Sequence, residues 1–325
     1  MAPTIFSMTF IDPWRKNVNP IPDVSLAGRT VLMTGGNAGL GLEAAIHFAR
    51  LSPSLLILAC RNTSSGESAA DRIAAETPLA RDRIQVWQLD LASFASVKAF
   101  GEKARELERL DVACLNAGVG ELSWKETGDG WEQMLQVNVL STGLLAIELL
   151  PLLLKTGDLP VPPGGEVLKP HLTIISSDVH YVCRFKEREA VTSGKHTSYL
   201  SALNDQSIGE IAKLPNVKGR VVVNAVNPGL TKSGFRDGFG VIASVILNFL
   251  AKDTAAAAEN YVYAGVVDTD KDAPDGGAFV SLGQVVAPSD FVLSEDGTEI
   301  SAKVFEELKA LWKKEDPKAV EAIFA

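Results

Sequence analysis

Apolar residues in this chain fall into short continuous runs separated by longer segments with helical spacing. Runs rich in valine, isoleucine and leucine predict buried strands at residues 30–36, 54–60, 84–91, 111–118, 171–177, 220–226 and 277–283. Helical spacing predicts helices at 41–51, 66–76, 94–110 and 130–155. Continuous apolar strands that alternate with helices indicate a parallel sheet covered on both faces. We therefore predict an α/β fold, a doubly wound parallel sheet of about seven strands with helices on both faces.

The predicted elements follow one another without a linker that would divide the chain. We expect residues 28–325 to form a single domain, preceded by an N-terminal extension over 1–27. The apolar, glycine-bearing segment 231–250 is an addition to the core. It suits a flexible lid over a small hydrophobic substrate, and equally a helix packed on the core or at the surface of a homodimer.

Composition and charge narrow the range of partners. The chain has 325 residues, 46% of them hydrophobic, and a net charge of −9, with no basic stripe to meet nucleic-acid phosphates. Its start lacks the basic segment and long apolar core of a signal peptide. The apolar runs 144–154 and 241–251 are shorter than the about 20 residues of a membrane helix. We expect a cytoplasmic protein that binds no nucleic acid and has no membrane span.

No framework of disulfides or metal ligands is visible in the sequence. The chain has three cysteines: Cys60, Cys114 and Cys183. They lie far apart without a CxxC pair, which fits a reducing compartment. The acidic segment 268–275 only superficially resembles a calcium loop, because its sixth position is Ala273 instead of glycine and its twelfth is Phe279 instead of glutamate. We expect no metal site.

The most informative stretch is TGGNAGLG at 34–41, which follows a predicted strand and opens a predicted helix. Its glycines at 35, 39 and 41 let the backbone approach a pyrophosphate, and the helix N-terminus supplies N–H donors and a partial positive charge. The spacing TGxxxGxG differs from GxGxxG and resembles that of the short-chain dehydrogenase/reductase family.

Five further motifs carry the same resemblance, and all stand at predicted strand ends or on the long helix, where a doubly wound sheet collects its ligand. They are LDL at 89–91, NAG at 116–118, NVLS at 138–141, ISS at 175–177 and NPG at 227–229. The resemblance spans residues 28–285, is closest to retinol-dehydrogenase-like and fungal members, and implies a Rossmann-type fold. The cofactor-binding residues that it implies are Gly35, Asn37, Gly39, Leu40, Gly41, Asp90, Leu91, Asn116, Ala117, Gly118, Pro228, Gly229 and Thr231.

The residue that follows the second predicted strand, 54–60, indicates the type of cofactor. A site for NAD usually places a carboxylate there to accept from the ribose 2′-hydroxyl. This chain has Arg61, followed by Asn62. A guanidinium suits the 2′-phosphate of NADP, although it could also be a solvated surface side chain. We predict NADP as the cofactor.

Members of the family interconvert an alcohol and a carbonyl by hydride transfer with the nicotinamide. A tyrosine moves the proton, a serine orients the substrate oxygen, and a lysine four residues after the tyrosine lowers its pKa from the same helix face. The resemblance implies Ser177 as the orienting serine, with Ser176 as a close alternative. It also implies Asn138 as the helix asparagine that holds a water of the proton relay.

The Tyr-xxx-Lys pair is missing from this sequence. Its four tyrosines are followed, four positions later, by Phe185, Leu203, Gly265 and Val267. In one explanation Tyr199 heads a divergent catalytic helix. In the other, which we favour, the helix segment carrying the tyrosine and lysine has been lost near residues 205–210. The expected function is that of an NADP-dependent oxidoreductase that interconverts an alcohol and a carbonyl on a small hydrophobic molecule, which the resemblance to fungal members assigns to secondary metabolism. The alternative is a nucleotide-binding protein without turnover.

Overall fold

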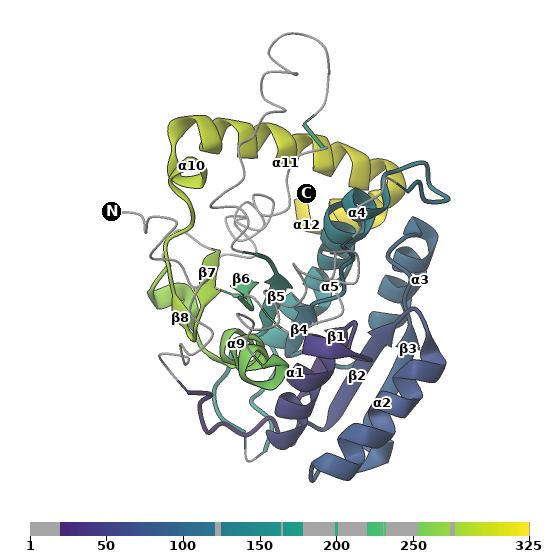
Figure 1. Cartoon of the computed structure of the whole chain (residues 1–325), viewed down its shortest axis with the longest axis vertical. Helices are drawn as coiled ribbons and strands as arrows, with labels where there is room; N and C mark the ends of the chain where they lie inside the picture. The colour runs from purple at the N-terminus through teal and green to yellow at the C-terminus, as the bar shows by residue number, and fades with distance from the viewer. Residues whose placement is uncertain are drawn as a thin grey trace, which may run out of the picture.

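The described part of the chain forms one large sheet with helices on both faces (Figure 1). The computed structural model describes residues 20–120, 125–163, 165–177, 199–200, 220–229, 231, 253–273 and 277–324. The strand order is β3-β2-β1-β4-β5-β6-β7-β8. Seven strands are parallel, and β8 pairs antiparallel with β7. The predicted α/β fold of Rossmann type is confirmed.

All seven predicted strands are present, within a residue or a few of their expected limits. They are β1 (Thr30–Thr34), β2 (Leu55–Cys60), β3 (Ile84–Gln88), β4 (Val112–Leu115), β5 (His171–Ile175), β6 (Val222–Asn227) and β7 (Ala278–Ser281). The eighth strand, β8 (Gln284–Val285), was not predicted because two residues show no periodicity. The sheet grows outward from β1 to β3 and then resumes with β4 on the other side of β1. This reversal creates the crevice in which such sheets bind ligands, at the carboxyl ends of β1 and β4.

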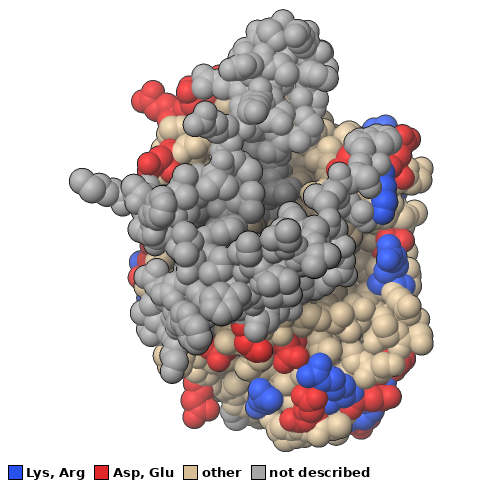
Figure 2. Space-filling view, in the orientation of Figure 1, with Lys and Arg blue, Asp and Glu red and all other residues tan. Residues whose placement is uncertain are grey.

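Three helices cover one face of the sheet. They are α1 (Gly39–Arg50), α2 (Thr63–Glu76) and α9 (Thr254–Val266). Phe48 of α1 and Tyr261 of α9 are fully buried there, in one apolar cluster with Val31 and Met33 of β1. A Cβ atom on Gly265 would lie 2.8 Å from the Phe48 ring, so α9 approaches α1 closely. Acidic and basic side chains are interspersed over the lower end of the view, around α1 and α2 (Figure 2).

The other face is covered by α3, by the long helical run that follows β4, and by the C-terminal helices. The bounds are α3 (Phe94–Ala104), α4 (Gln133–Leu135), the π-helical turn η4 (Gln136–Ser141), α5 (Thr142–Gly157), α11 (Glu295–Glu315) and α12 (Pro317–Phe324). Short elements complete the described chain: η3 (Arg81–Arg83), η7 (Thr269–Lys271) and α10 (Asp290–Leu293). Figure 1 shows α11 along the top of the view.

Two predicted helices differ in detail from the observed ones. The α3 helix ends at Ala104, before the predicted limit of 110, because the chain then turns and the Leu110 amide donates to Thr156 Oγ1 on the approach to β4. The predicted helix 130–155 is observed as Gln133–Gly157, but it is interrupted by the π turn.

The run Gln133–Gly157 is long and apolar enough, by length and composition, to cross a membrane. In the structure, 89% of its 18-residue apolar window is buried inside the protein. It packs between the sheet, α3 and the C-terminal helices, as the core helix of this face. The other long apolar run, 241–251, lies outside the described residues, as do most of the expected extension and lid.

Candidate functional site

The glycine loop after β1 has the geometry of a cradle. Gly35 has φ +66°, and its amide donates to the Ala59 carbonyl over 2.7 Å. Gly39 has φ +54°, and, apart from its chain neighbours and the adjacent helix backbone, no atom of the described residues lies within 4 Å of the position where its Cβ would stand. A Cβ on Gly41 would lie 2.3 Å from the Gly35 carbonyl oxygen. The loop is thus closed tightly on its helix side and open above Gly39.

The helix that opens at this loop has an uncapped N-terminus. Its N-cap residue, Ala38, is extended and makes no side-chain cap, and the first turn contains no acidic residue. Leu40, in that turn, is half-buried. The first N–H groups of a helix have no partner within the helix, so this end favours an anion. The arrangement fits a pyrophosphate held by backbone N–H groups.

The carboxyl ends of β1 and β4 are tied together by Thr34. Its Oγ1 accepts from the amides of Asn116 and Ala117, each over 2.9 Å. The Asn116 Nδ2 atom in turn donates to the Thr34 carbonyl oxygen over 2.9 Å. Thr34 was missed among the sequence-based site residues, although it is the first residue of the TGGNAGLG stretch. It fixes the wall of the crevice at the point where the strand order reverses.

Asn138 braces the loop that follows β4. Its Oδ1 accepts from the Val119 amide over 2.8 Å, and its Nδ2 donates to the Val119 carbonyl over 2.9 Å. A Cβ on Gly118 would lie 3.1 Å from Asn138 Oδ1, so the loop passes close to this side chain. The structure therefore gives the side chain a bracing role. The expected part of Asn138 in a water relay stays a prediction.

Asp90 and Leu91 stand where the chain leaves β3. The Asp90 amide donates to Ser96 Oγ over 2.9 Å, and Asp90 Oδ1 accepts from the Ala92 amide over 2.9 Å. Leu91 is buried in the core of the α3 face. These bonds fix the turn from β3 into α3 and hold the half-buried Asp90 at the carboxyl edge of the sheet. Its contact with adenine stays a prediction.

Arg61 follows β2 and is exposed. Its guanidinium makes no hydrogen bond or ion pair with the described part of the chain. Asn62 caps α2 by accepting from the Ser65 amide over 3.1 Å, and the first turn of α2 contains no acidic residue. Asn37 of the glycine loop donates from Nδ2 to Ser65 Oγ over 3.0 Å, which holds the two N-termini side by side. A guanidinium and a helix N-terminus both attract anions, and no carboxylate in the first turn of α2 opposes them, so this corner of the site favours a phosphate.

The ends of β5 and β6 place the remaining predicted residues on the same edge of the sheet. The Ser176 amide donates to the Val226 carbonyl over 2.7 Å, and Ser177 is exposed just beyond. After β6, Pro228 is half-buried, and Gly229 has φ +74° with its amide donating to Asn227 Oδ1 over 3.0 Å. These residues follow β6, which pairs with β5, the strand that precedes Ser177. Thr231 is buried, with 5% of its surface exposed.

The described tyrosines are buried in the two apolar faces. Tyr199 is 7% exposed, belongs to the apolar cluster that includes α11, and its amide donates to Glu307 Oε2 over 2.8 Å. Tyr261 is fully buried on the opposite face, where burial raises its pKa well above the ordinary value. Tyr181 and the suspected joint at 205–210 lie outside the described residues. The catalytic role of Tyr199 stays a prediction.

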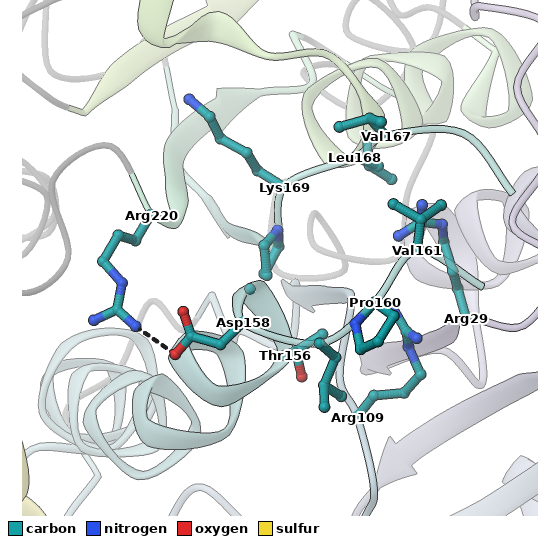
Figure 3. A pocket seen from close by; sticks show the side chains of 13 residues that line it. Arg29, Arg109, Thr156, Asp158, Pro160, Val161, Val167, Leu168, Lys169 and Arg220 are labelled. Carbon is teal, nitrogen blue, oxygen red and sulfur yellow. Dashed lines mark hydrogen bonds and ion pairs between the residues drawn. The ribbon is translucent and has the colours of Figure 1, made fainter.

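A cavity of about 260 Å³ lies at the opposite edge of the sheet, near the amino ends of β1, β4, β5 and β6 (Figure 3). Arg220 and Asp158, paired over 2.8 Å, stand on one side of it, and Val161 and Val167 on the other. Its remaining cations are also paired: Arg29 and Arg109 with Asp111, and Lys169 with Asp268 and Asp270. The cavity is separate from the predicted cofactor site.

Comparison with known proteins places this architecture in a family. The short chain dehydrogenase model matches residues 29–159. The fungal short-chain dehydrogenase/reductase phmF of Phaeosphaeria nodorum is 35% identical, over 94% of this chain and 93% of that one. The short chain dehydrogenase/reductase dmxR8 of Cryptosporiopsis sp. is 33% identical, over 89% and 92%. This chain therefore belongs to the short-chain dehydrogenase/reductase family, an oxidoreductase family, and is of the fungal type.

A solved structure supports the same assignment. A short chain dehydrogenase from Escherichia coli CFT073, complexed with NADPH, is 25% identical, has a TM-score of 0.54, and covers 77% of this chain and 95% of that one. The alignment with phmF extends over 329 positions, more than the 325 residues of this chain, yet includes only 94% of them. That relative therefore has residues without a counterpart in this chain.

Proposed function

We propose that this chain binds NADP(H) and that its reaction is the interconversion of an alcohol and a carbonyl on a small hydrophobic molecule, in fungal secondary metabolism. The observation that carries the proposal is the guanidinium of Arg61, which follows β2 beside the N-terminus of α2 and is unpaired within the part of the chain that the structure describes. No carboxylate in the first turn of α2 competes for it or would repel a 2′-phosphate. The likeness to a relative complexed with NADPH supports the same cofactor.

Different residues of the site would bind different parts of the cofactor and the substrate. The open glycine loop and the uncapped N-terminus of α1 suit the pyrophosphate, and Arg61 with the N-terminus of α2 suits the 2′-phosphate. A bound nicotinamide would supply the hydride acceptor or donor. The Ser177 hydroxyl, exposed beyond β5, would orient the substrate oxygen by a hydrogen bond.

A second function, nucleotide binding without turnover, is favoured by the missing Tyr-xxx-Lys pair. Without a cation beside it, a tyrosine keeps its pKa near 10 and is a poor proton donor and acceptor at neutral pH. Loss of general acid catalysis lowers rates by typically 10²- to 10⁴-fold. Sequencing the transcript across codons 200–215 tests this directly. A transcript that contains an additional segment with a Tyr-xxx-Lys pair would contradict the second function.

The cofactor proposal is tested by Arg61→Ala with a matched control. Titration with NADPH, followed by fluorescence, should show affinity lowered by about tenfold or more, because a charge-assisted hydrogen bond is lost. Affinity for NADH should stay the same. The control is Arg83→Ala, which removes an equal charge at the amino end of β3, where Arg83 bonds the Ser54 carbonyl. Equal loss for both nucleotides, or for both variants, would contradict the proposal.

A further inference from the structure

Trp312 reaches from α11 into the helical run that carries Asn138. Its side chain is fully buried, and its indole Nε1 donates to the Leu140 carbonyl oxygen over 2.9 Å. The two residues are 172 positions apart. Leu140 lies inside the π turn Gln136–Ser141. The α11 helix is therefore bonded to the π turn of the long helix.

The ring of Trp312 occupies the space beside Gly143 that the side chain of any other residue would fill. A Cβ on Gly143 would lie 2.2 Å from Trp312 Cζ2 and 3.0 Å from Cη2. Gly143 is in the first turn of α5, directly after the π turn. Phe305 also packs against the indole, edge to face, with ring centroids 6.2 Å apart. Glycine is a poor helix former, so its presence here serves the close approach of the indole.

The π turn is held by side chains at several points. Thr142 Oγ1 donates to the Val137 carbonyl over 2.8 Å, one residue further back than an α-helical turn would place it. Gln136, which is fully buried, donates from Nε2 to Asp129 Oδ2 over 2.5 Å and accepts from Thr127. A π turn shifts the register of all following residues and is frequently found at functional sites. The turn needs such bonds because it is the less stable geometry.

Asn138 is the residue of the π turn that contacts the loop after β4, next to the proposed cofactor site. Its amide group makes both bonds to Val119, next to Gly118 of the NAG motif. Two residues before Gly118, Asn116 is bonded to Thr34 at the reversal of the sheet. A continuous set of contacts therefore runs from Trp312 through Leu140 and Asn138 to the crevice.

We propose that Trp312 is a positioning residue for the cofactor site: its indole holds the π turn in the register that aims Asn138 at the loop after β4. This rests on the proposed NADP(H) site. The C-terminal helix α11 thereby determines the shape of the crevice wall without touching the cofactor. Trp312 and Gly143 contact each other. A change in either residue should therefore disturb the loop after β4.

The test is amide hydrogen exchange of the cofactor-free protein, together with NADPH titration. Trp312→Phe keeps an aromatic ring but removes the N–H donor, and should raise exchange in peptides covering 116–120 and 133–142 by about three- to tenfold. NADPH affinity should fall by a similar factor. The control is Val320→Ala, which removes buried apolar surface in α12 on the same face and should leave both peptides unchanged.

Gly143→Ala is the second variant, in case Trp312→Phe fails to fold. Helix propensity alone predicts slower exchange for this change, by stabilising α5. Displacement of the indole predicts faster exchange in both peptides. Unchanged exchange in both variants would overturn the proposal, whether or not NADPH binds. Faster exchange with unchanged NADPH affinity would overturn its link to the cofactor site, while failure of the wild type to bind NADPH would refute the proposed function separately.

Discussion

Thr34 Oγ1 accepts hydrogen bonds from the amides of Asn116 and Ala117 at the point where the sheet reverses its direction of growth. Thr34→Val keeps the shape of the side chain and removes the acceptor. Two amides would then lose their partner, at a cost of about 1–3 kcal/mol of unfolding free energy. Chemical denaturation should show this loss, and NADPH affinity should fall because the crevice wall loosens.

The matched control is Thr173→Val in β5. Thr173 is also fully buried in a strand, but its Oγ1 has no hydrogen-bond partner among the described residues. The same substitution there should be neutral or stabilising, because it removes an unsatisfied hydroxyl. If the two variants lose equal stability, the hydrogen bonds of Thr34 Oγ1 to the residues after β4 do not account for the loss.

Glu148 of α5 is buried, and its carboxyl group accepts a hydrogen bond from Arg105, the residue that follows α3. Burial raises the pKa of Glu148 to about 8; the nearby Asp316 and Glu102 add to the rise, and Arg105 opposes it. The folded protein therefore keeps this proton up to about pH 8, whereas the unfolded chain releases it near pH 4.5. Stability from this group is complete below pH 4.5 and is lost as the pH rises towards 8, by about 1.4 kcal/mol per pH unit.

Glu148→Gln removes the titration and keeps the shape. Denaturation at several values between pH 5 and 8 should show a flatter profile for this variant than for the wild type. Glu321→Gln in α12 is the control, since that side chain is exposed and its loss should leave the slope unchanged. A wild-type slope that survives Glu148→Gln would assign the pH dependence to other groups.

Tyr199 packs beside α11, and its amide is held by Glu307. If the catalytic tyrosine belongs to a lost segment, Tyr199→Phe should change the reduction of a panel of carbonyl compounds with NADPH by less than about twofold. Ser177→Ala should abolish whatever turnover exists, because the serine orients the substrate oxygen. A loss of 10²-fold or more in Tyr199→Phe would instead identify Tyr199 as the proton donor.

Local patterns were enough to predict most of the sheet and the position of the glycine loop after β1. Gly35, Gly39 and Gly41 stand in a fixed spacing after a strand, and the motifs at 116–118 and 227–229 end strands that the apolar runs already define. Parallel strands bring these ends to one edge, so their meeting follows from the order of the elements.

Features that depend on distant contacts could not be predicted in this way. The bond of Trp312 to Leu140 joins residues 172 positions apart. The π turn at Gln136–Ser141 changes the register by one residue, which apolar periodicity does not reveal. The role of Thr34 beyond ending β1 could not be predicted either, because it depends on the amides of Asn116 and Ala117, which follow β4 far along the chain.

The measurement that tests the central claim most directly is the dissociation constant of the wild-type protein for NADPH and for NADH at the same ionic strength. The guanidinium of Arg61, which pairs with none of the described residues, and the first turn of α2, which has no carboxylate, predict binding of NADPH at least about tenfold tighter than that of NADH. The preference should shrink as salt is added, because it is electrostatic. Equal affinity for the two nucleotides, or tighter binding of NADH, would contradict the account.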